Sequence, residues 1–135
     1  GMLWASQVAP GNENGLRLRI YGDKAGLSWS QENPNYLTFS PLGEPSRLLG
    51  RGGPGLTGAA ERVTRIPPGH PEGYLEGFAT IYREVADAIE AKRNGKDQPD
   101  EVNFPDFEEG LQGMRFVDAV LRSHKNGGVW TSLNS

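Results

Sequence analysis

The longest amphipathic pattern of the chain lies between residues 67 and 93. Apolar residues recur there at intervals of three and four, which predicts a helix with one apolar stripe. The stripe consists of Leu75, Phe78, Ala79, Tyr82, Val85, Ala86 and Ile89. Pro71 suits a first helical position, so we expect the helix to begin near His70 or Pro71. Asn94-Gly95 supplies the left-handed residue that ends a helix.

Short segments with period-two alternation dominate the first 50 residues, and this alternation is typical of β-strands. The predicted strands lie at 3–8, 16–21, 27–32, 36–40 and 47–49, with one more at 129–133. Turn residues at 22–26 and 33–35 favour an antiparallel meander. One face of this meander carries Leu16, Leu18, Ile20, Leu27 and Trp29. We expect that face to be the floor on which the apolar helix stripe packs.

A second helix is predicted to follow Asp106, because Asp106 and Glu109 have the spacing of a capping box. Its broad apolar face consists of Phe107, Leu111, Met114, Phe116, Val117, Val120 and Leu121. Asn126-Gly127-Gly128 is expected to end it. Gly110 and Gly113 weaken a helix interior, so we expect another backbone to approach them closely.

Together these elements predict an α+β fold, in which a largely antiparallel open sheet carries two main helices on one face. The length of 135 residues fits a single domain over 1–135. The net charge of −3 and the lack of a basic stripe argue against a nucleic-acid partner. The chain has no cysteine and no apolar run long enough to span a membrane, which favours a cytoplasmic protein.

The segment 50–69 is rich in glycine and proline, and Gly50, Gly52 and Gly55 match the pattern G-x-G-x-x-G. Pro54 lies inside the match, and no strand–turn–helix unit surrounds it, so the pattern does not indicate a dinucleotide site. We interpret it as a flexible glycine-rich loop, of a length that is usually functional or partly disordered.

His70, Glu72 and Tyr74 are the candidate substrate-binding residues. An imidazole, a carboxylate and a phenol close together would hydrogen-bond the hydroxyls of a polyol or move a proton. The structural alternative is that His70 replaces an N-cap residue and that Glu72 pairs with the helix dipole.

The other candidates for chemistry favour structural roles. His124 lies at a predicted helix end, where a cation is favourable. Neither histidine has a carboxylate at metal-ligand spacing, so no metal site is expected. Trp4, Trp29 and Trp130 fall on predicted strands, where packing in the core or at an interface explains them.

Three segments in order carry a resemblance to a known family. They are SQVAPGNENGLRLRIYGDKAGLSWSQENPNYL, RIPPGHPEGYLEGFATIYREVADAI and DFEEGLQGMRFVDAVLRSHKNGGVWTSL. This succession closely resembles the carboxyl-terminal portion of the Gfo/Idh/MocA oxidoreductases, which include glucose-fructose oxidoreductase and inositol dehydrogenase. The likeness covers nearly the whole chain.

The resemblance implies an activity as well as a fold. Family members join a Rossmann domain that holds NAD or NADP to an α+β domain whose open sheet shapes the substrate site and often mediates oligomers. They transfer a hydride between the nicotinamide and a hydroxyl-bearing carbon of a sugar or cyclitol. In the relatives the loop containing His70, Glu72 and Tyr74 borders the substrate cleft.

Three family motifs are missing from this sequence: the nucleotide fingerprint, a Glu-Lys-Pro segment and an Asp-x-x-x-His segment. We therefore expect no cofactor site, no catalytic residue and no turnover in this chain alone. The hypothesis is a fragment or truncated product that forms the substrate-side and oligomerisation part of a sugar or cyclitol dehydrogenase, and associates with itself through the open sheet face. The alternatives are a stand-alone carbohydrate-binding or self-assembling module, and an enzyme completed by a separately encoded Rossmann partner.

Overall fold

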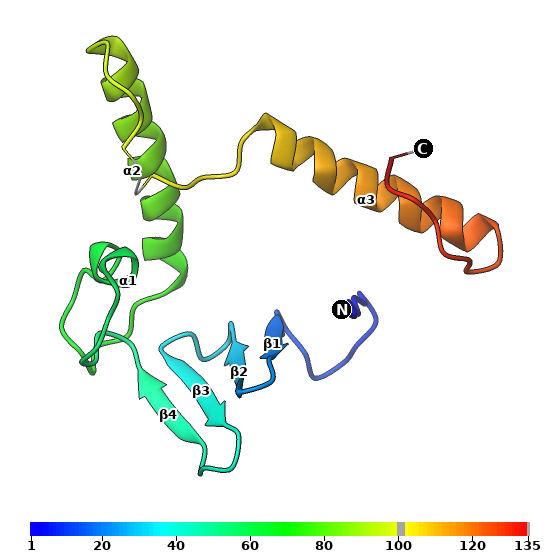
Figure 1. Ribbon diagram of the computed structural model, residues 1–135, viewed down its shortest axis with the longest axis horizontal. Helices are drawn as coiled ribbons and strands as arrows, with labels where there is room; N and C mark the ends of the chain where they lie inside the picture. Colours follow the sequence, from blue (N-terminus) through cyan, green and yellow to red (C-terminus); the bar gives the residue numbers. More distant parts are fainter. Residues whose placement is uncertain (100–101, 135) are drawn as a thin grey trace. The chain divides into compact units, whose positions relative to one another are not determined.

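The computed structural model describes residues 1–99 and 102–134 (Figure 1). Its elements are β1 (Arg17–Tyr21), β2 (Ala25–Ser30), β3 (Tyr36–Pro41), β4 (Arg47–Gly50), α1 (Gly58–Arg62), α2 (Tyr74–Arg93) and α3 (Phe107–Lys125). The four strands form one open antiparallel sheet in the order β1-β2-β3-β4, and two of the helices are long. The predicted α+β class with a largely antiparallel open sheet is therefore confirmed.

The chain divides into two compact units, Gly1–Thr80 and Ile81–Ser135. The sheet, α1 and the first two turns of α2 belong to the first unit. The remainder of α2 and the whole of α3 belong to the second. A single domain over 1–135 stays a prediction.

The sheet is the antiparallel meander that the turns predict, and its pairing places apolar residues of neighbouring strands opposite one another. Leu18 lies opposite Trp29, and Ile20 lies opposite Leu27, in the β1–β2 hairpin. Leu27 in turn lies opposite Phe39 of β3, so one face of the sheet is a continuous apolar row. The indole N–H of Trp29 donates to the carbonyl of Pro34 at 3.1 Å, which ties β2 to the turn that follows it.

Two predicted strands are not formed. Residues 3–8 and 129–133 have no strand structure, so Trp4 and Trp130 do not lie on strands. Alternation over five or six residues shows only that a segment is able to pair, whereas a strand also needs a neighbouring edge that offers its backbone groups. Trp29 does lie on a strand, as predicted.

Helix α2 begins at Tyr74, later than the predicted start near His70 or Pro71. Gly73 is its first capping position: the carbonyl of Gly73 accepts from the N–H of Gly77, and the N–H of Gly73 donates to Oε2 of Glu76. The helix ends as predicted at Asn94-Gly95, where Gly95 has a φ of 66°. Residues 100 and 101, beyond this end, lie outside the described residues.

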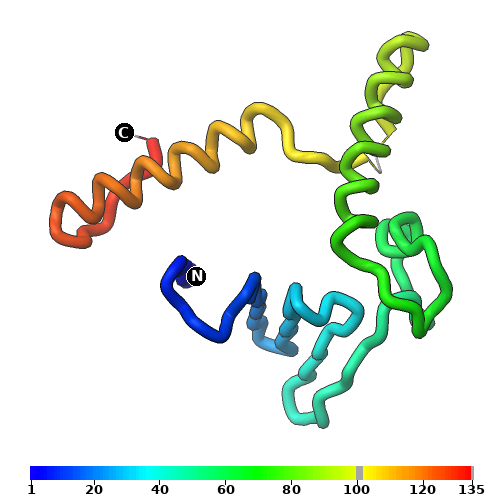
Figure 2. Tube along the Cα trace, turned by 180° about the vertical axis from the view of Figure 1, so that it is seen from behind, coloured from blue at the N-terminus to red at the C-terminus, as the bar shows by residue number. Residues whose placement is uncertain are grey.

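In the second unit the chain turns back along α2 after this end (Figures 1 and 2). The N–H of Asn103 donates to Oε2 of Glu84 at 3.1 Å. Glu84 is only 4% exposed, and Val102 beside this contact is 8% exposed. The returning segment is therefore fixed to α2 through a buried carboxylate.

Helix α3 has the predicted capping box. Oδ1 of Asp106 accepts from the N–H of Glu109, and Oε2 of Glu109 accepts from the N–H of Asp106, both at 3.0 Å. The helix ends before two successive left-handed glycines, Gly127 and Gly128. Its start and end therefore agree with the prediction.

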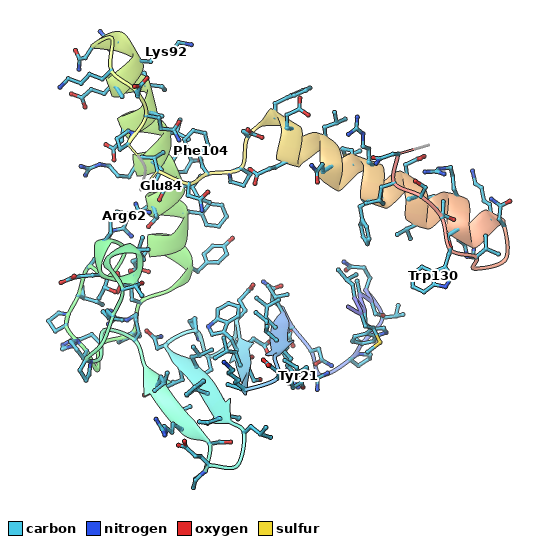
Figure 3. All side chains as sticks on the ribbon, in the orientation of Figure 1. Tyr21, Arg62, Glu84, Lys92, Phe104 and Trp130 are labelled. Atoms are coloured by element: carbon cyan, nitrogen blue, oxygen red, sulfur yellow. The ribbon has the colours of Figure 1, made fainter. Side chains whose placement is uncertain are left out.

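The segment 128–134 then runs back beside α3 and has no strand structure (Figure 2). The hydroxyl of Ser123 donates to the carbonyl of Val129 at 2.7 Å, and Nη2 of Arg122 donates to the carbonyl of Ser132 at 2.9 Å. Side chains of the helix thus bond the backbone groups that a strand would offer to a neighbour. The Trp130 ring projects into solvent (Figure 3).

Apolar faces that the pattern assigned to the core are exposed. Within the first unit, Leu18 is 51% exposed, Ile20 63% and Leu75 75%. The expected burial of the helix stripe on the sheet floor is therefore wrong for these residues, because periodicity identifies an apolar face without showing what covers it. The expectation for Gly110 and Gly113 is also wrong, because neither has an atom within 4 Å of an added Cβ in the described chain.

No helix among the described residues is long and apolar enough to cross a membrane.

Candidate functional site

The candidate site lies where the end of β4 meets the loop that leads into α2, within the first unit. Arg51 follows β4 directly, and its side chain reaches the segment 66–72. The N–H of Arg51 also donates to the carbonyl of Asn35 at 2.8 Å, which extends the β3–β4 pairing by one bond. The start of the loop is thus set by the sheet.

The Arg51 guanidinium is the centre of a hydrogen-bond network. Nε donates to Oδ1 of Asn35 at 3.1 Å, and Nη1 donates to the carbonyl of Ile66 at 3.1 Å. Nη2 donates to the carbonyls of Pro67 at 3.0 Å and of His70 at 2.8 Å. A segment with three prolines cannot satisfy its carbonyls by forming a helix, so one side chain satisfies several of them.

Glu72 completes this network as a buried ion pair. Its Oε2 lies 2.6 Å from Nη1 of Arg51, and the two side chains are only 5% and 16% exposed. Oε1 accepts from the N–H of Arg65 at 2.9 Å, and the N–H of Glu72 donates to Oδ1 of Asn35 at 3.0 Å. These bonds hold residue 72 outside the helix and explain why α2 begins after Pro71.

Gly73 and Pro34 bring the two halves of the site into contact. A Cβ added to Gly73 would lie 3.1 Å from Cγ of Pro34. That distance is tighter than ordinary van der Waals contact, so the backbone of the α2 entrance lies directly against the β2–β3 turn. Glycine at this position permits the approach.

His70 lines a pocket of about 230 Å³. The lining residues are Asn33, Asn35, Tyr36, Gly50, Arg51, Gly69, His70 and Pro71. The imidazole, the Tyr36 phenol and the Asn33 carboxamide are groups that hydrogen-bond hydroxyls. The pocket is smaller than the roughly 300–1,000 Å³ typical of drug-sized ligands, so it suits a small polar molecule.

The three predicted substrate-binding residues do not all face this pocket. Glu72 is buried against Arg51, so its carboxylate acts beneath the pocket wall. Tyr74 is 71% exposed, and its ring lies 5.0 Å from that of Phe78 at an angle of 58°. The structure thus places His70 at the pocket and Tyr74 on the first turn of α2. Glu72 lies beneath the pocket wall, where it pairs with Arg51.

The carboxyl group of Glu76 has a lowered pKa, chiefly because it accepts a hydrogen bond from the N–H of Gly73. Its own backbone N–H and the charge of Arg65 act in the same direction. A charged Glu76 therefore caps α2 at the edge of the site.

The glycine motif at 50–55 does not fit a dinucleotide. Gly52, with a φ of 72°, turns the chain after β4, and the helix that follows has only five residues and begins at Gly58. Every strand pairing in the described sheet is antiparallel. A pyrophosphate cradle needs a strand leading directly into a helix N-terminus, which these residues do not form.

His124 lies in the last turn of α3, where a cation complements the helix dipole. No group of three or more histidine, aspartate or glutamate residues able to hold a metal is found in 1–99 and 102–134.

Arg51 and Asn35 are the site residues that the sequence reasoning missed. The available signal was an arginine between two glycines, directly after a strand and ahead of a proline-rich segment. Flanking glycines leave room for a guanidinium to be surrounded by backbone, and Asn35 lies in a predicted turn.

A family model described as "Oxidoreductase family, C-terminal alpha/beta domain" (GFO/IDH/MocA) matches residues 1–133. The uncharacterized oxidoreductase YfiI of Bacillus subtilis (strain 168) is 37% identical over 131 residues, which are 96% of this chain and 33% of that protein.

Solved structures show the same likeness. An oxidoreductase from Sinorhizobium meliloti is 58% identical with a TM-score of 0.91, covering 98% of this chain and 36% of that one. An inositol dehydrogenase homologue from Azotobacter vinelandii, complexed with NADH and myo-inositol, is 35% identical with a TM-score of 0.89, covering 96% of this chain and 34% of that one. The chain thus spans about a third of the length of these relatives.

Proposed function

Because the chain belongs to the GFO/IDH/MocA oxidoreductase family, whose C-terminal α/β domain it matches, we propose that it is the substrate-facing part of an NAD- or NADP-dependent oxidoreductase. The proposed substrate is a sugar or a cyclitol. The observation that carries the proposal is the polar pocket that His70 lines beside Asn33 and Tyr36. A relative solved with NADH and myo-inositol supports this choice of substrate class.

In this proposal His70 contacts a substrate hydroxyl, and its imidazole is able to accept or donate the proton of that hydroxyl. Glu72 acts through Arg51 and keeps the backbone of residue 70 in place. Tyr74 contacts the substrate from the exposed first turn of α2. When bound to the rest of such an enzyme, the nicotinamide supplies the hydride chemistry. The described residues of this chain form no cradle for it, so we expect no turnover by the chain alone.

A segment exchange tests the proposal. Residues 1–135 replace the matching segment of the Sinorhizobium meliloti oxidoreductase, to which they are 58% identical. Polyol-dependent reduction of NAD and NADP is then measured with and without His70→Gln. We expect His70→Gln to lower kcat/KM about 100-fold or more, the lower end for loss of a general acid or base.

The matched control for this experiment is His124→Gln, which changes the other histidine of the chain at the end of α3. It is expected to leave kcat/KM unchanged. Equal effects of the two substitutions, or activity of the His70→Gln enzyme equal to that of its parent, would contradict the role of His70.

We also propose that the polar face of the sheet joins subunits. Arg19, Tyr21 and Ser28 share that face by register, and Tyr21 is 75% exposed. We expect light scattering to give a mass of two or more chains for the parent. In the double variant Arg19→Glu/Tyr21→Ala the mass should fall to that of one chain. A monomeric parent chain would contradict this part of the proposal.

A further inference from the structure

The guanidinium of Arg51 directs most of its N–H groups to oxygens of the protein. An arginine carries five N–H donors and no acceptor. Five oxygens surround this one: Oδ1 of Asn35, the carbonyls of Ile66, Pro67 and His70, and Oε2 of Glu72. Four hydrogen bonds therefore run from the guanidinium to protein oxygens, although Arg51 lines the pocket. Oε2 of Glu72 is its ion-pair partner but accepts no hydrogen bond from the described residues.

The charge of Arg51 is also compensated. The Glu72 carboxylate lies 2.6 Å away, and the low exposure of both side chains limits the screening of the pair by water. An anionic ligand entering the pocket would meet an arginine whose charge is already compensated and most of whose N–H groups are bonded to the protein, so it would gain little for the hydration that it gives up.

The second cation near this segment is engaged elsewhere. Nη1 of Arg65 donates to the carbonyl of Glu76 at 2.7 Å, and Nη2 donates to Oγ1 of Thr80 at 2.9 Å. Besides Arg51, the titratable groups that line the pocket are the Tyr36 phenol and the His70 imidazole.

We infer that Arg51 is a positioning residue that holds His70 at the pocket wall, and that its four hydrogen bonds to the protein and its ion pair with Glu72 make the pocket selective for a neutral polyol over a sugar acid or sugar phosphate. This inference rests on the proposed function, because it takes the pocket as the substrate site. An arginine in a sugar pocket ordinarily favours an anionic substrate. Here the arginine binds the protein backbone instead of the ligand.

The test uses the 135-residue chain with two probes that differ only at C6, D-glucose and D-glucuronate. At pH 8 the probes are added at millimolar concentration, and the imidazole and amide NMR signals of His70 are followed. We expect glucose and myo-inositol to shift these signals. The glucuronate concentration that gives the same shift should be at least tenfold higher. This comparison involves no variant, so it does not depend on the folding of a mutant.

The positioning role is tested with Arg51→Lys, which keeps the positive charge. Lysine offers three donors on a flexible stem, so it cannot reproduce a five-oxygen network. We expect the His70 amide signal to move, the response to glucose to fall at least tenfold, and the β1–β2 amide signals to stay in place. Arg47→Lys, at an exposed arginine of β4 that pairs with Glu44, is the matched control and should change none of these signals.

Glu72→Gln tests the charge compensation through the relative affinities for glucuronate and glucose, which a purely structural role of Glu72 would leave unchanged. It leaves the Arg51 charge uncompensated, so glucuronate should gain affinity relative to glucose. Glucuronate binding to the parent chain as tightly as glucose would overturn the inference while leaving the proposed function in place. Absence of any His70 response to the neutral sugars would instead overturn the proposed function of the pocket. A full glucose response in Arg51→Lys would overturn the positioning role.

Discussion

The buried ion pair between Arg51 and Glu72 makes a quantitative prediction about stability. Glu72→Gln keeps the size of the side chain but removes its charge and places an amide within reach of the guanidinium. Removing one partner of a buried pair costs roughly 3–5 kcal/mol, because the remaining charge stays buried. Arg51 is 16% exposed and retains four other acceptors, so we expect the low end, about 3 kcal/mol.

Urea unfolding followed by Trp29 fluorescence measures this loss. Trp29 lies in the same unit and is bonded to the turn beside the site. Trp4 and Trp130 are 77% and 105% exposed, so both are changed to Phe in the parent to leave one reporter. With a denaturant slope of about 1–3 kcal/mol per molar urea, the midpoint should fall by about 1–3 M.

The control is Glu44→Gln, whose partner Arg47 is on β4. Their side chains are 55% and 57% exposed, and such a pair contributes at most about 1 kcal/mol. A double-mutant cycle that adds Arg51→Met should show a coupling of at least about 1 kcal/mol with Glu72→Gln. Midpoints for Glu72→Gln and Glu44→Gln that agree within error, with no coupling in the cycle, would refute the reasoning.

Three further predictions follow from local structure. Gly73→Ala should destabilise the α2 entrance by about 1–3 kcal/mol, because the added Cβ would meet Cγ of Pro34 at 3.1 Å. Urea unfolding measures this loss of stability, and Gly77→Ala, where the added Cβ meets open space, is the control. Asp106→Ala should cost about 1 kcal/mol and speed amide exchange in the first turn of α3, whereas unchanged exchange there would count against the cap. The lowered pKa of Glu76 means that its contribution is complete above its ordinary pKa of 4.5 and is lost as the pH falls through the lower folded value. Stability curves of the parent chain and Glu76→Gln should therefore converge below pH 4.5, and parallel curves would exclude this role.

Some features of the helices and the sheet depend only on residues close together in the sequence. The end of α2 at Asn94-Gly95 and the capping box of α3 were predicted because each depends on residues three to five positions apart. The antiparallel pairing of β1 with β2 was predicted for the same reason, since the turn residues between the two strands are local.

The start of α2 was predicted wrongly because the deciding interactions are not local. The preference of Pro71 for a first helical position is real, but Glu72 is held by Asn35, which is 37 residues away along the chain, and by Arg51. The candidate site likewise has features that the local sequence indicated and features that depend on distant contacts. The sequence indicated that His70, Glu72 and Tyr74 were worth examining, but it could not show that the carboxylate lies beneath the pocket wall.

The antiparallel pairing of β1 to β4, the end of α2 and the capping box of α3 were determined by the sequence alone, because each results from steric and hydrogen-bonding preferences within a few residues. The tertiary structure alone decided that the segment 129–133 lies beside α3 without forming a strand. It alone also decided the role of Arg51. In both places a side chain from a distant residue or a neighbouring helix satisfies backbone carbonyls, and no local pattern records which donor will reach them.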